Sequence, residues 1–64
     1  MTYTLLVFRP PQATPVARVR LNHAPDVLGA IPTLLETYHD ASHVEVVAAN
    51  ATLFRVDRSG RTTR

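Results

Sequence analysis

The chain contains no cysteine and no lysine, and glycine occurs only twice among its 64 residues. Without cysteine it can form neither a disulfide framework nor a cysteine-containing zinc site. The two glycines, Gly29 and Gly60, cannot make a glycine-rich loop that cradles phosphate. A chain this short buries only about 60% of the surface that its unfolded form exposes. Its stability must therefore come from a well-patterned core, from oligomerisation or from a partner.

Long apolar runs are also missing. The run at residues 5–8 is too short for a signal peptide or a membrane span, and no basic segment precedes it. We therefore expect a cytoplasmic protein that makes no membrane contact. The composition, 45% hydrophobic and 19% charged, is that of a folded protein rather than a disordered tail. The length predicts one small domain over residues 1–64.

All of the basic side chains are arginine, and the formal net charge is +2. They are Arg9, Arg18, Arg20, Arg55, Arg58, Arg61 and Arg64. Two explanations stay open: a GC-rich genome, or selection for the planar guanidinium at a recognition surface. No two of these arginines are consecutive, so the basic footprint usual for nucleic-acid binders is weak.

The first third of the chain predicts two strands. Residues 3–8 are apolar on both faces, as in a central strand, and the prolines at 10–11 end the ladder. Residues 16–21 alternate, with Arg18 and Arg20 on one face and apolar side chains on the other. The second segment is therefore expected to be half-buried.

A helix is predicted next. Pro25 and Asp26 suit its first turn, where proline fits and an acid meets the positive end of the helix dipole. An apolar stripe at helical spacing follows, made of Val27, Leu28, Ile31, Leu34, Leu35 and Tyr38. Pro32 interrupts the backbone hydrogen bonding. Because the stripe stays in phase across it, we favour one kinked helix over a short turn followed by a second helix.

The segments 43–48 and 53–57 alternate and predict a hairpin. Matching their apolar faces requires a loop of odd length. A loop of Ala49, Asn50 and Ala51 pairs Val46 with Phe54 and Val44 with Val56 inside, and Glu45 with Arg55 and His43 with Asp57 outside. The alternative loop, residues 50–52, would place two acids opposite each other and is disfavoured. Residues 59–64 are either a short edge strand or a frayed tail.

The predicted architecture is a small α+β two-layer sandwich, β-β-α-β-β, with antiparallel hairpins and one kinked helix on one sheet face. The other face would mix apolar groups with arginines, whereas the open sheet face of a monomer is normally polar. Arginine and aromatic residues are enriched at interface hot spots. The candidate partner-binding residues are Tyr3, Arg18, Arg20, Val47, Leu53 and Arg55. The first strand could contribute either Tyr3 or Phe8 to this face, because the two point in opposite directions.

No pattern in the sequence predicts catalysis. His39 and His43 are four apart, but the helix is expected to end between them, so they do not form a metal-binding pair on one helix face. Ser42 and Ser59 lie in turn contexts where serine is common. We therefore expect no enzyme and no catalytic, cofactor or metal site. His43 opposite Asp57 suggests a pH-dependent surface contact.

The favoured function is a non-enzymatic protein-binding module that acts by stoichiometric association, with a homodimer through the open sheet face as one form. Small accessory, regulatory and phage-type inhibitor proteins share this size and lack of catalytic groups. The comparison is with a general class of proteins and not with a particular family. The alternative is binding of an RNA or DNA backbone through Arg18, Arg20 and Arg55.

Overall fold

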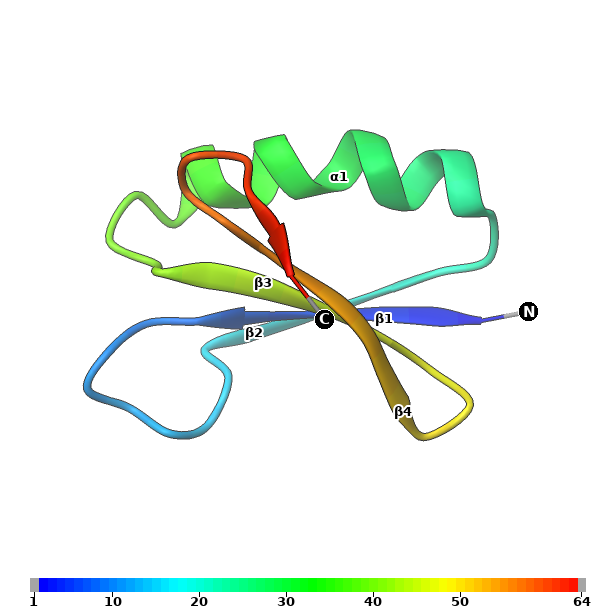
Figure 1. Cartoon of the computed structure of the whole chain (residues 1–64), viewed down its shortest axis with the longest axis horizontal. Coiled ribbons are helices and arrows are strands. Elements are labelled where there is room, and N and C mark those ends of the chain that lie inside the picture. Colours follow the sequence, from blue (N-terminus) through cyan, green and yellow to red (C-terminus); the bar gives the residue numbers. More distant parts are fainter. Residues whose placement is uncertain (1, 64) are drawn as a thin grey trace.

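An antiparallel sheet with one helix across it makes up the computed structural model, which describes residues 2–63 (Figure 1). Its elements are β1 (Tyr3–Phe8), β2 (Ala17–Leu21), α1 (Ala24–Thr37), β3 (His43–Ala48), β4 (Ala51–Asp57) and β5 (Thr62–Thr63). The expected small α+β class is confirmed. Within the predicted tail, Thr62 and Thr63 form a short edge strand paired with β4.

The strand order is β2-β1-β3-β4-β5, and every neighbouring pair is antiparallel. The helix links β2 to β3, so the chain passes over β1 and leaves that strand between β2 and β3. Leu5 and Val7 of β1 are completely buried beneath the helix. This burial explains why the helix side of β1 is apolar, whereas Thr4, Leu6 and Phe8 on its other side are only half-buried.

The core lies between α1 and one face of the sheet. It consists of Leu5, Val7, Val27, Ile31, Leu35, Ala41, Val44 and Val46. Leu28 departs from the expected apolar stripe, because 65% of it is exposed. The helix packs over β1, β2 and β3, so Phe54 and Val56 of β4 are only half-buried.

The helix runs as one element through Pro32, as predicted. His23 occupies the N-cap position, but its side chain makes no capping hydrogen bond. Pro25 lies in the first turn, where the missing N–H has no helical partner to lose. Pro32 is exposed, so its ring does not enter the core.

The β3–β4 register is the predicted one, but the predicted turn is wrong. His43, Val44, Glu45 and Val46 lie opposite Asp57, Val56, Arg55 and Phe54. The turn contains two residues rather than three: Ala49 (φ 52°) and Asn50 (φ 63°) both adopt positive φ, as a type I′ turn requires. A β-bulge at Leu53 supplies the extra residue. A two-residue turn plus one bulge residue places three unpaired residues between the strands, as a three-residue loop does. The pairing beyond the bulge is therefore the same in both cases.

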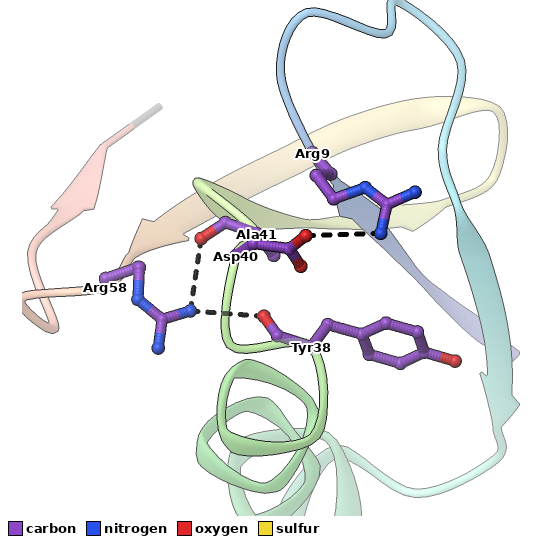
Figure 2. Close-up of polar contacts among 5 residues, drawn as sticks. All are labelled: Arg9, Tyr38, Asp40, Ala41 and Arg58. Atoms are coloured by element: carbon purple, nitrogen blue, oxygen red, sulfur yellow. Dashed lines mark hydrogen bonds and ion pairs between the residues drawn. The ribbon is translucent and has the colours of Figure 1, made fainter.

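Two arginines, Arg9 and Arg58, contact the segment at the end of α1 (Figure 2). Nη1 of Arg58 donates to the carbonyl oxygens of Leu35 at 3.0 Å, Tyr38 at 3.2 Å and Ala41 at 3.1 Å. Arg9 forms an exposed ion pair with Asp40 at 3.2 Å. The turn after β4 and the loop after β1 are thereby both tied to the connection between α1 and β3.

Candidate protein-binding surface on the open sheet face

The open face is the side of the sheet that points away from α1. The strand register arranges its side chains in rows that cross the sheet. One row holds Arg20, Thr4, Val47 and Thr52; the next holds Arg18, Leu6, Glu45 and Arg55; the last holds Phe8, His43 and Asp57. Basic groups therefore lie on β2 and on β4, and the strands between them present both apolar groups (Leu6, Phe8, Val47) and polar ones (Thr4, His43, Glu45).

Three arginines of this face are exposed: Arg18, Arg20 and Arg55. Within residues 2–63 none of them takes part in an ion pair or donates a side-chain hydrogen bond. Arg18 and Arg55 stand three strands apart, which corresponds to roughly 14 Å across the sheet. The face thus carries free guanidinium groups at both of its sides.

A half-buried cluster lies between Arg18 and Arg55. The His43 ring stacks on Phe8, with centroids 4.9 Å apart and planes inclined by 13°. Its Nε2 lies 3.4 Å from a carboxylate oxygen of Glu45, which forms an ion pair when the imidazole is protonated. Only 19% of the Glu45 side chain is exposed. The one carboxylate at the centre of the face is therefore directed toward His43.

Two predicted cross-strand contacts do not form, although the register places their residues opposite each other. Glu45 lies opposite Arg55 but contacts His43 instead. The Asp57 carboxylate accepts hydrogen bonds from the Ser59 hydroxyl at 2.6 Å and from the N–H groups of Ser59 and Arg61, both at 3.0 Å. These bonds, led by the Ser59 hydroxyl and the Arg61 N–H, lower the pKa of Asp57. The turn therefore uses the carboxylate that was expected to face His43.

Ser42, His43 and Glu45 form a short polar chain. The Ser42 hydroxyl lies 2.8 Å from Nδ1 of His43 and 3.5 Å from the Phe8 carbonyl oxygen. Nucleophilic catalysis would also need donors aimed at a developing oxyanion. The Ser42 hydroxyl instead joins the end of β1 to the start of β3. No group of three His, Cys, Asp or Glu side chains in residues 2–63 could hold a metal ion.

Two projections border the open face. The loop between β1 and β2 and the β3–β4 turn both bend to the side opposite α1 (Figure 1). Pro10, Pro11, Gln12 and Ala13 of that loop, with Phe8, Ser42, His43, Glu45 and Arg55, line a hollow of about 250 Å³. The face is therefore shallowly concave beside Phe8.

Four of the six predicted partner-binding residues share the open face: Arg18, Arg20, Val47 and Arg55. Tyr3 does not, because it lies opposite Leu21 on the helix side and packs against the core. Leu53 does not either, because the bulge turns it toward α1. There it lines an apolar hollow of about 270 Å³ with Tyr3, Leu28 and Phe54.

The sequence analysis missed Leu6 and the Phe8–His43 pair as parts of this surface. Phe8 belonged to one of the two alternatives for the first strand, and both alternatives are apolar. No signal inside residues 3–8 separates them. His43 was examined for metal binding and for contact with Asp57, and its stacking on Phe8 depends on the β1–β3 pairing.

No helix in the described part of the chain is both long enough and apolar enough to cross a membrane. Searches against family models, curated proteins and solved structures gave no match to this chain.

Proposed function

We propose that this protein is a non-enzymatic protein-binding module that docks an acidic protein surface on its open sheet face. One observation carries the proposal: Arg18, Arg20 and Arg55 are exposed on the open face. Among residues 2–63 they have no ion-pair partner and no helix covers that face. We include a cytoplasmic location and a regulatory or inhibitory role in the same proposal, and both rest on the sequence.

Free guanidinium groups support an acidic partner. Arginine binds carboxylates through two parallel hydrogen bonds, which adds orientation as well as energy. Leu6 and Val47 are half-buried between the arginines and offer apolar contact at the centre of the face. An apolar centre with a charged rim is the usual anatomy of a protein interface.

The charge distribution favours a different protein over a second copy. Face-to-face packing of two copies would bring six arginines together, three from each copy. The acid at the centre, Glu45, already contacts His43 and is mostly buried. Like charges at an interface suppress association. A homodimer through this face is therefore the weaker form of the proposal.

Nucleic-acid binding is the second candidate, because Phe8 shares the open face with the arginines. Sheet aromatics that stack on bases are a common RNA-binding device. Here His43 already covers one side of the Phe8 ring, and the carboxylate of Glu45 lies in the row between Arg18 and Arg55. Three phosphate contacts would give a salt slope of about −2.7 on duplex DNA. A titration that shows such a slope would favour this candidate over protein docking.

The proposal is tested by affinity purification from the native host. The bait is either the wild-type protein or the triple variant Arg18→Gln, Arg20→Gln and Arg55→Gln. We expect the partner to be lost with the triple variant, because its carboxylates no longer meet guanidinium groups. The control is Arg61→Gln, which removes an exposed arginine in the turn before β5.

Thermal unfolding should show that the variants are folded, since the three arginines on the open face are exposed. Recovery of the same partner at the same level with the triple variant would refute docking on this face. Size-exclusion mass of the purified protein separates the two forms of the proposal, because a homodimer doubles the mass without any partner.

A further inference from the structure

Strand β2 leaves a free backbone edge on the sheet. It pairs with β1 on one side, and the strand order places no other described strand beside it. An edge strand presents unpaired N–H and C=O groups that can pair with a strand from another chain. The five residues Ala17–Leu21 continue in regular register with β1. This edge is therefore available for strand addition.

The opposite edge of the sheet is less suitable. Strand β5 covers β4 at Arg55 and Val56. The first part of β4 contains the bulge at Leu53, and bulges twist an edge away from regular pairing. The structure thus has one regular open edge, at β2, among the strands that it describes.

The side chains of β2 specify which kind of strand would fit. Arg18 and Arg20 are exposed and point to the open face, whereas Val19 and Leu21 are half-buried on the helix side. Residues of an added strand would stand directly opposite them on the same faces. Those opposite Arg18 and Arg20 should be acidic, and the residue between them should be apolar.

We propose that the β2 edge binds an extended segment of a partner protein by strand addition, with acidic residues opposite Arg18 and Arg20 and an apolar residue opposite Val19. Backbone hydrogen bonds would supply the affinity, and the alternating pattern would supply the specificity. The inference rests on the proposed function in assuming a protein partner. It shares Arg18 and Arg20 with the open face, but it uses the backbone edge of β2 and does not need Arg55.

A second copy of the chain is a poor occupant of this edge. If two β2 strands paired antiparallel about Val19, with both helices on the same side, Arg18 of each would face Arg20 of the other. Like charges directly opposite each other destabilise a strand pair. The two arginines therefore oppose self-pairing while they favour an acidic strand.

The test uses the ¹⁵N-labelled protein and a seven-residue peptide with blocked ends, in which glutamate alternates with valine, at low salt. Binding should shift the amide resonances of Ala17–Leu21 and slow their hydrogen exchange. A matched peptide with lysine in place of glutamate should bind at least tenfold more weakly. Equal affinity of the two peptides, no binding, or shifts confined to residues 51–56 would overturn the proposal.

Variants separate the edge from the open face. The double variant Arg18→Gln and Arg20→Gln should weaken the peptide by about tenfold, because two cross-strand charge pairs are lost. Arg55→Gln is the matched control and should bind the peptide as the wild type does, since Arg55 lies three strands away. An equal loss of affinity in Arg55→Gln would contradict strand addition at β2.

The two proposals can fail independently. If the peptide does not bind but capture of the cellular partner requires Arg55, the edge proposal is wrong and open-face docking stands. If the peptide binds at β2 and capture of the partner requires Arg18 and Arg20 but not Arg55, open-face docking is wrong and the edge proposal stands.

Discussion

Arg58 is expected to contribute more to stability than the other arginines. Its Nη1 donates to the carbonyl oxygens of Leu35, Tyr38 and Ala41 at and after the end of α1, where carbonyls have lost their intrahelical partners. The Tyr38 carbonyl also accepts a hydrogen bond from the Ala41 N–H at 2.9 Å. Hydrogen bonds from a charged donor are worth about 1.5–3 kcal/mol each. One nitrogen carries only two hydrogens, so the three contacts count as two bonds at most. Because Arg58 is exposed, water competes for both bonds, so we take about 1 kcal/mol for each and expect Arg58→Ala to cost about 2 kcal/mol.

In a domain of this size each kcal/mol lost from the free energy of unfolding lowers the Tm by about 4–8 °C. Arg58→Ala should therefore lower the Tm by about 8–16 °C. Far-UV circular dichroism during heating measures it, and urea unfolding gives the free energy directly. Arg61→Ala is the control. Arg61 donates its backbone N–H to the Asp57 carboxylate, and Arg61→Ala keeps that bond. The free energy of unfolding of this variant should therefore stay within about 0.5 kcal/mol of the wild-type value.

Arg58→Lys adds a comparison. Lysine keeps the charge and three donors but lacks the planar guanidinium, so we expect part of the stability to return. A cost of Arg58→Ala no greater than that of Arg61→Ala would refute the reasoning, because it would mean that water satisfies the three carbonyls equally well.

Three further predictions concern stability. Ala49→Gly should raise the free energy of unfolding by about 1 kcal/mol, because alanine is strained at φ 52° and glycine is not; a lower stability in urea would contradict the type I′ turn. Pro32→Ala should stabilise the protein by about 1–3 kcal/mol, because the new N–H can bond the Leu28 carbonyl at an exposed site; an unchanged Tm would show that proline costs nothing there. Asp57 has a lowered pKa in the folded state, so its contribution is present above its ordinary value of 3.8 and is lost as the pH falls through the folded value. Asp57→Asn should flatten the acid limb of a Tm-against-pH curve, and an unaltered limb would argue against the turn hydrogen bonds.

The spacing of apolar and polar residues was enough to predict the class and the helix, and together with the charges of Glu45, Arg55 and Asp57 it predicted the β3–β4 register. Val44, Val46, Phe54 and Val56 must share the buried face, and a shift of one residue would expose them all. That constraint acts along a short stretch of chain, so it can be evaluated without knowing the fold. It also brought Arg18, Arg20, Val47 and Arg55 to one face.

The turn shows where this reasoning stops. A three-residue loop and a two-residue turn with a bulge satisfy the same apolar pattern, and the sequence around Asn50 contains no glycine to distinguish them. The choice moves Leu53 from the open face to the helix side. One predicted partner-binding residue, Leu53, was therefore assigned to the wrong face although the register on the strands was right.

The first strand was ambiguous for a related reason. Tyr3, Leu5 and Val7 are as apolar as the alternate set ending at Phe8, so either could have faced the helix. The pairing of β1 with both β2 and β3 places Leu5 and Val7 in the core. Phe8 and His43 then meet on the open face.

The alternation of apolar and polar residues along each strand was thus enough to predict the two layers and the charged face. This alternation depends only on residues that are close in sequence. The partners of the long polar side chains required the packed structure. Arg58 bonds carbonyls 17 to 23 residues away, and Arg9 pairs with an acid 31 residues away. Such contacts form only where packing brings distant segments together, and no local pattern records which segments those are. Within residues 2–63, Arg18, Arg20 and Arg55 on the open face form no ion pair and donate no side-chain hydrogen bond, and we therefore propose that they bind a partner.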